Sequence, residues 1–224
     1  MPMLRRYLRL RHSEQQLHSV ERLDLFSDAV LAIAATLLVL SLNVPDVIGR
    51  GGIRHVLESQ RYTFLAILIG FLEVGGSWVM SRRLTRITAH VDHWLTLIWL
   101  AAIFTVTLIP FTTLLLARSI GHPDFGIAVM CVSVVTWLAL AFSTVAIAYV
   151  RRAGLLRPQA EPIYGSYLRM VLIADVVWTL AIPLSLVLPA VTLAVLVLGY
   201  ATGLSPLVTE GRDLPADPPI PNED

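Results

Sequence analysis

The 224-residue chain has no lysine, a single cysteine and few charged side chains. Charged residues make up 15% of the sequence, whereas soluble domains average about 25%. Apolar residues make up 56%, which is more than a soluble domain of this size is able to bury. The composition therefore disfavours a water-soluble enzyme, a nucleic-acid-binding protein and a disordered protein.

The missing residue types also limit the chemistry. Seventeen arginines and 16 acidic residues leave a net charge of only +1, so no strong field attracts nucleic acid. Cys131 lies in an apolar run, and we expect it to be a small core side chain rather than part of a disulfide or a thiolate metal site. The sequence contains no HExxH or GxSxG motif, so we predict no catalytic residue, no metal ligand and no cofactor.

Long apolar stretches are what the chain has in abundance. A helix that crosses the hydrocarbon core of a membrane needs about 20 mostly apolar residues. The sequence therefore predicts an all-α, polytopic membrane protein with six transmembrane helices, at Leu23–Leu42, Tyr62–Met80, His93–Ala117, Phe125–Val150, Leu168–Leu188 and Pro189–Val208. These helices would form one domain over residues 23–208, between a basic amino-terminal segment (1–22) and a disordered tail (209–224) rich in proline and acids.

The division between the last two spans is the least defined. Pro183 and Pro189 bracket the short stretch Leu184–Leu188. Because proline interrupts helical hydrogen bonding, this stretch is compatible with a hairpin or with one kinked helix.

The positions of the arginines predict the orientation in the membrane. If the amino terminus is cytoplasmic, the cytoplasmic segments hold twelve arginines and the segments on the other side hold four. Short loops rich in arginine stay in the cytoplasm, so both termini are predicted to be cytoplasmic and the protein to span the cell membrane. No small-x-small cleavage site follows the first apolar run, so we expect the first helix to be retained.

Four ionisable side chains fall within or at the ends of the predicted spans: Asp28, Glu73, His93 and Asp175. Such a group costs at least about 2.5 kcal/mol at the centre of a membrane, so each one is a candidate functional residue. His93 lies beside Trp94 at a predicted interface, where a snorkelling role is more common. Glu73 is expected either to pair with a buried arginine or to carry a proton, and the same two kinds of role remain open for Asp175.

The first span begins with a polar pair and continues as an apolar stripe. Ser27 and Asp28 lie about one turn inside the boundary, where they must find donors on neighbouring helices. Ile33, Leu37 and Leu40 then recur on one helical face, with Thr36 beside them. Periodicity alone predicts that this stripe is a packing seam between helices.

Several of these residues resemble a known family. Arg22, Phe26, Ser27 and Asp28 have the spacing Arg-x-x-x-Phe-Ser-Asp, and the following Ala-Ile-Ala and Thr-Leu-Leu segments continue the likeness. Trp78 in the second span and the segment Ile-Pro-Phe-Thr-Thr near the end of the third add to it. The chain resembles the transmembrane protein 175 family of endosomal and lysosomal potassium channels, in its short prokaryotic branch with a single six-helix repeat.

The resemblance implies a homotetrameric, potassium-permeable cation channel in a lipid bilayer, with the first helices surrounding the axis. It assigns the pore constriction to Ile33, Leu37 and Leu40, and a polar layer of the pore to Thr36. It also implies a clamp that holds the first helix against the second and third, formed by Arg22, Phe26, Ser27, Asp28 and Trp78.

Two positions depart from the family pattern. Ser81 stands where family members commonly have histidine, and Trp99 stands where asparagine is common. We therefore expect either that Arg82 or Arg83 replaces the histidine as a partner of Asp28, or that the assembly is gated differently. Two other functions remain open, a proton-coupled transporter that uses Glu73 and Asp175, and a membrane scaffold that does not conduct ions.

Overall fold

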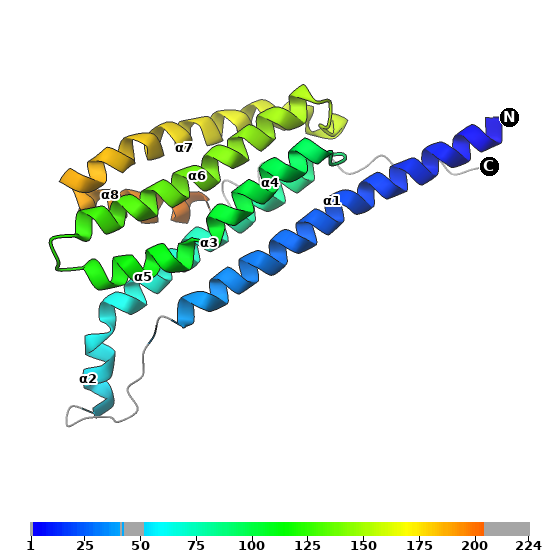
Figure 1. The fold of residues 1–224 in the computed structure, drawn as a ribbon. Coiled ribbons are helices and arrows are strands. Elements are labelled where there is room, and N and C mark those ends of the chain that lie inside the picture. Colours follow the sequence, from blue (N-terminus) through cyan, green and yellow to red (C-terminus); the bar gives the residue numbers. More distant parts are fainter. Residues whose placement is uncertain (1, 41, 43–51, 204–224) are drawn as a thin grey trace.

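A computed structural model describes residues 2–40, 42 and 52–203 of the chain. Within these residues every regular element is a helix (Figure 1). The elements are α1 (Pro2–Val39), α2 (Gly52–Ser59), α3 (Arg61–Ile87), α4 (His93–Val106), α5 (Ile109–Ser119), α6 (Phe125–Arg152), the 3-10 helix η1 (Pro158–Ala160), α7 (Glu161–Val187) and α8 (Pro189–Gly203). The predicted all-helical architecture is thus confirmed.

Four helical segments are long and apolar enough to cross a membrane. They are Arg61–Ile87, His93–Ser119, Phe125–Arg152 and Pro158–Val187, with a shorter apolar helix at Pro189–Tyr200. These segments correspond to the second through fifth predicted spans. The first and sixth spans remain predictions, and residues 204–208 of the sixth lie outside the described residues.

The first helix is longer than the predicted span. α1 runs without a break from Pro2 to Val39, so much of the basic amino-terminal segment and the first apolar stretch belong to one helix. Figure 1 shows its amino-terminal half extending beyond the other helices of the bundle. The predicted tail at 209–224 lies outside the described residues.

The third span differs from the prediction because it consists of two helices. α4 ends at Val106 and α5 begins at Ile109, with Pro110 in the first turn of α5. Proline has no backbone N–H to donate, so it fits the first turn of a helix and interrupts a longer one. The two helices still form one candidate span, His93–Ser119, and continue in nearly the same direction (Figure 1).

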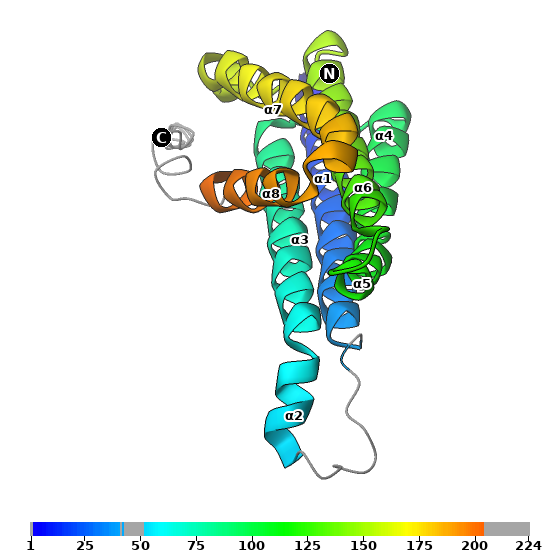
Figure 2. The same ribbon diagram turned by 90° about the vertical axis from the view of Figure 1, so that its left-hand side faces the viewer.

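The last two helices form the hairpin and not the kinked helix. Pro183 lies inside α7, and the chain leaves helical geometry only at Leu188, where φ is −131° and ψ is 63°. α8 then begins at Pro189 and runs back beneath α7 (Figures 1 and 2).

The short helix α2 was not predicted, because its sequence lies in the polar stretch between the first and second predicted spans. Arg54 Nε donates to Glu58 Oε1 over 2.9 Å, one turn later in this helix. Such pairs stabilise a helix by only about 0.2–0.5 kcal/mol. Residues 43–51, which precede α2, lie outside the described residues.

The arginine-rich connections meet at one end of the bundle. The amide of Arg157, after α6, donates to Ile87 O over 2.8 Å, and the amide of Ala89 donates to Leu155 O over 2.8 Å. The guanidinium of Arg157 also donates to Thr88 O over 2.9 Å. The α3–α4 and α6–α7 connections are therefore held together, and their arginines share one end of the molecule.

Asp92 caps α4 at this end. Its carboxylate accepts from the Leu95 amide over 2.7 Å and from Tyr149 Oη over 2.6 Å, which ties α4 to α6. Partial burial acts to raise the pKa of Asp92, but the hydrogen bonds from Tyr149 and Leu95 and the nearby His90 outweigh it, so the pKa lies below its usual value.

We expect Asp92→Ala to lower the free energy of unfolding by about 1–2 kcal/mol, because an N-cap is lost. A carboxylate with a lowered pKa stabilises the fold above its unfolded-state pKa, and this contribution disappears as the pH falls through the folded-state value. Melting temperatures in detergent between pH 7 and pH 3 should therefore fall less steeply for Asp92→Ala than for the parent. Asp92→Asn, which keeps a capping oxygen, is the matched control, and equal melting of all three proteins would contradict the assignment.

Candidate functional site

The first helix presents two different faces. One face is buried against α3, α4 and α5 and comprises Leu23, Ser27, Leu31, Ala34 and Leu38. Leu31, Ala34 and Leu38 pack with apolar side chains of α3, α4, α5 and α6, namely Val74, Val106, Ile109 and Val135. The packing seam of α1 is thus formed by these residues and not by the predicted stripe.

The predicted stripe lies on the other face. Ile33, Leu37 and Leu40 are 59%, 44% and 77% exposed, whereas Leu38 between them is 1% exposed. Thr36 is also exposed, and its hydroxyl donates to Ile33 O over 2.8 Å. A single subunit therefore leaves an apolar face of α1 uncovered, and such faces mark contacts with other molecules.

Gly70 on α3 allows α1 to lie this close to its neighbours. A Cβ atom at this position would come within 2.4 Å of Thr113 Oγ1 on α5 and 2.9 Å of Leu38 Cδ2 on α1. Only glycine therefore fits where the three helices meet, and small residues of this kind permit close packing of membrane helices.

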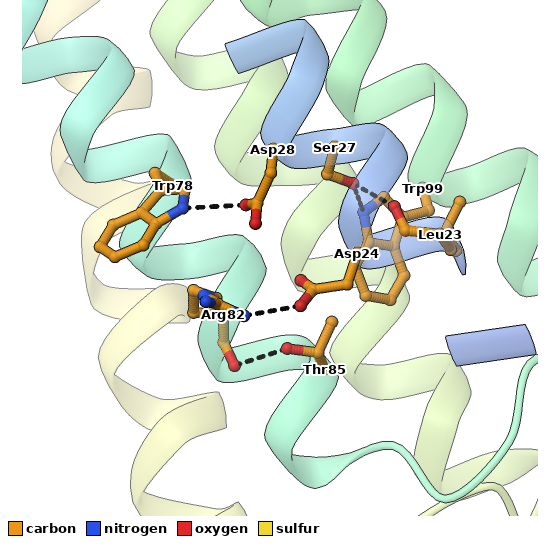
Figure 3. A network of polar contacts seen from close by, with 8 residues as sticks. All are labelled: Leu23, Asp24, Ser27, Asp28, Trp78, Arg82, Thr85 and Trp99. Atoms are coloured by element: carbon orange, nitrogen blue, oxygen red, sulfur yellow. Dashed lines mark hydrogen bonds and ion pairs between the residues drawn. The ribbon is translucent and has the colours of Figure 1, made fainter. Parts of the chain in front are cut away.

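A polar cluster near the arginine-rich end joins α1 to α3 (Figure 3). Trp78 Nε1 donates to Asp28 Oδ1 over 2.9 Å. One turn away, Arg82 Nη1 donates to Asp24 Oδ2 over 2.7 Å. The Arg82 guanidinium also lies 5.4 Å from the centre of the Trp78 ring. The two carboxylates of α1 are therefore bound by two neighbouring side chains of α3.

The same cluster joins α1 to α4 through buried groups. Trp99 Nε1 donates to Ser27 Oγ over 3.0 Å, and the Ser27 hydroxyl in turn donates to Leu23 O over 2.8 Å. Ser27 and Trp99 are both almost fully buried. Trp99 thus contacts the first helix directly, although this position departs from the family pattern.

The structure differs from the predicted clamp in its partners. Asp28 binds Trp78, and Arg82, which we expected at Asp28, binds Asp24. Arg22 and Phe26 are exposed and lie outside the cluster. Sequence reasoning missed Asp24, although it precedes Asp28 by one turn on the same face, a spacing that brings side chains together on a helix.

We predict that Ser27→Ala and Trp99→Phe destabilise the protein non-additively. Either change removes one partner of a buried hydrogen bond, and an unsatisfied buried polar group costs about 1–3 kcal/mol. The double variant should therefore be little less stable than the worse single variant, with a coupling energy of about 1 kcal/mol. Thermal melting of the parent, the two single variants and the double variant in detergent measures the coupling energy. Strictly additive losses of stability would show that the hydrogen bond between Trp99 and Ser27 contributes nothing.

The two carboxylates in the later spans have separate surroundings. Glu73 is 1% exposed, and its Oε1 accepts from Thr136 Oγ1 on α6 over 2.5 Å, while Tyr200 on α8 lines the same cavity. Of the two roles left open for Glu73, pairing with an arginine is not seen among the described residues, where the Thr136 hydroxyl is its partner. Asp175 Oδ2 accepts from Thr144 Oγ1 over 2.6 Å.

Two further expectations concern single side chains. His93 is exposed and makes an edge contact with the Trp94 ring at 5.9 Å. This placement at the start of α4 agrees with a role at the membrane interface. Cys131, which we expected to be a small core side chain, is half-buried in α6. Neither residue belongs to the polar cluster.

Comparison with known proteins relates the chain to one family. Residues 22–110 match a family described as "Endosomal/lysosomal potassium channel TMEM175". This range includes the whole polar cluster and the apolar stripe. A potassium channel of Streptomyces collinus is 32% identical over 142 residues, covering 62% of this chain and 69% of that protein. A potassium channel of Chamaesiphon minutus is 36% identical over 113 residues, covering 48% of this chain and 54% of that protein.

A solved structure has the same fold. The crystal structure of a lysosomal potassium-selective channel TMEM175 homolog from Chamaesiphon minutus superposes with a TM-score of 0.74 at 23% sequence identity. It covers 83% of this chain and 96% of that chain. This likeness shows the fold, whereas the family match over residues 22–110 and the match to the Streptomyces protein show that the chain belongs to the TMEM175 family, a family of ion channels and not of enzymes.

Proposed function

We propose that the protein is a potassium-permeable cation channel whose pore is lined by α1. The observation that carries the proposal is the uncovered apolar face of α1, since the helix is buried on one side and exposes Ile33, Leu37 and Leu40 on the other. The potassium channels related to this chain in sequence support the permeant ion.

The proposed assembly is a homotetramer in which four copies of α1 surround the axis. Four copies of the exposed stripe would then face one another instead of lipid. Ile33 and Leu40 are seven residues apart, so the apolar neck would be roughly 10 Å long. Such a neck excludes water when narrow, and it must widen or rotate before a hydrated cation passes.

The proposed pore has no ring of backbone carbonyls to replace the hydration shell of the ion. The Thr36 hydroxyl, which donates to Ile33 O, offers its oxygen lone pairs as the nearest polar group. Selectivity for potassium over sodium is therefore expected to be modest.

The polar cluster would position the pore helix. The contacts of Asp24, Ser27 and Asp28 with α3 and α4 fix the rotation of α1 about its own axis. Rotation by one residue, about 100°, would turn the stripe away from the axis. The cluster lies next to the connections rich in arginine, and we propose, from the positive-inside rule, that this end faces the cytoplasm.

The alternative of a proton-coupled transporter has less support. Glu73 lines an internal cavity, whereas Asp175 does not line it and is bound to Thr144 instead. The two carboxylates therefore do not share one passage through the subunit. Measurement of potassium flux distinguishes the channel from a scaffold that does not conduct ions.

Potassium flux into liposomes containing the purified protein tests the proposal. We expect flux that follows the potassium gradient, does not require a proton gradient and is smaller when sodium is the only cation. A folded tetramer with no flux would favour the scaffold. Saturable flux that requires a proton gradient and disappears in Asp175→Asn would favour the transporter.

A further inference from the structure

A cavity of about 450 Å³ lies inside the subunit, between α3, α4, α6, α7 and α8. Its volume falls in the range of sites for small molecules, roughly 300–1,000 Å³. Most of its wall is apolar and includes Leu84, Ile103, Leu140, Val171 and Trp178. An empty void of this size destabilises a protein, and the apolar part of the wall offers water no partner, so an occupant with a long apolar part fits best.

The cavity also has polar groups that recognise a head group. Ser81 and Arg83 belong to its wall near the end of α3. Glu73, which accepts from Thr136, lies about two helical turns away from them on the same wall. Ser81 Oγ is buried and has no hydrogen-bond partner within the described residues. Arg83 is almost fully buried, and its contacts include Met170 Sδ at 3.7 Å and the Tyr167 ring at 5.8 Å. A guanidinium in the wall of an apolar cavity suits an anionic group such as phosphate.

A shallow groove on the outer side of α7 adjoins the cavity. Ile173 and Val177 line both of them, and both side chains are also exposed on the surface of the subunit. The groove continues along α7 past the exposed side chain of Arg169. Two apolar depressions thus meet at a shared rim, with one arginine in each of them.

We propose that this site binds an anionic phospholipid of the membrane. One acyl chain occupies the cavity, the second lies in the groove of α7, and Arg83 and Arg169 hold the phosphate. Two chains match two depressions, whereas a fatty acid has one chain and covers only one of them. A zwitterionic lipid carries a choline cation close to two arginines, and it therefore binds more weakly than a lipid with net negative charge.

Quenching of tryptophan fluorescence by brominated acyl chains tests the site. Trp99 and Trp178 line the cavity and are buried, whereas Trp78 and Trp94 are exposed, so Trp78, Trp94 and Trp137 are replaced by phenylalanine and the remaining fluorescence reports on the cavity. The full-length protein is reconstituted in phosphatidylcholine vesicles that contain increasing amounts of dibromo-phosphatidylglycerol or dibromo-phosphatidylcholine. We expect the glycerol lipid to quench at about a tenfold lower mole fraction, the effect of one or two charge-assisted hydrogen bonds.

Variants separate this site from general contact with lipid. Arg169→Gln and Arg83→Gln should remove the preference for phosphatidylglycerol, and Ala174→Phe should reduce quenching by filling the cavity. Arg118→Gln, at an exposed arginine on α5, is the matched control and should retain the preference. Arg169 is exposed, so its variant is expected to fold even where Arg83→Gln does not. Equal quenching by both lipids, or by a dibromo fatty acid at the same mole fraction as phosphatidylglycerol, would overturn the proposal.

Discussion

Leu37→Asn is expected to raise potassium flux about tenfold or more in liposomes. Leu37 lies in the middle of the exposed stripe of α1, between Ile33 and Leu40. An asparagine ring at this level would keep water in the neck, and a decrease of only about 1.4 kcal/mol in the barrier gives a tenfold increase in rate. Flux of potassium through the reconstituted variant measures this effect.

The control uses the same substitution on a surface that the proposed pore does not include. Leu180 on α7 is 65% exposed, so Leu180→Asn adds an equal polar group outside α1. This variant should conduct like the parent protein. If Leu37→Asn also conducts like the parent, the stripe does not limit permeation.

Gly70→Ala is expected to lower stability by about 3 kcal/mol and to displace α1. Its new Cβ would overlap Thr113 Oγ1 and Leu38 Cδ2, and overpacking of a tight contact costs typically 1–3 kcal/mol, occasionally more. Because Leu38 is on the buried face of α1, the displacement should also alter potassium flux. The melting temperature and the elution volume in detergent report stability and assembly.

Gly165 on α7 supplies the matched control for this change. No heavy atom lies within 4 Å of a Cβ built at Gly165. Gly165→Ala should therefore be neutral or stabilise the helix by up to about 1 kcal/mol. Adding Thr113→Ala to Gly70→Ala removes the nearest clashing atom and should restore part of the lost stability. Equal melting of the two alanine variants would contradict the close approach at Gly70.

The sequence was sufficient to predict the helical architecture and the location of the long apolar helices, because membrane spans depend on length and apolar composition. It also identified the apolar stripe Ile33, Leu37 and Leu40, but periodicity alone predicted that this stripe is a packing seam between helices. An apolar stripe inside a subunit and one at a pore axis have the same period. Only the burial of Leu38 and the exposure of its neighbours separate the two faces of α1.

The partners of the polar residues were harder to predict. Arg82 is 58 positions from Asp24 along the chain. It binds Asp24 and not Asp28 because of the orientation of α3 relative to α1, which local sequence does not specify. Thr136 as the partner of Glu73 likewise depends on the packing of α6. Local patterns identify which side chains need partners, whereas the packing of the helices decides which partners they find.

Accessibility of a cysteine at position 37 is the most direct test that α1 lines the pore. Leu37→Cys is prepared with Cys131→Ala, and potassium flux is followed before and after addition of a positively charged, water-soluble thiol reagent. We expect the reagent to stop flux, while Leu180→Cys in the same background remains unaffected. Flux through Leu37→Cys that continues unchanged after complete labelling would contradict a pore lined by the first helix.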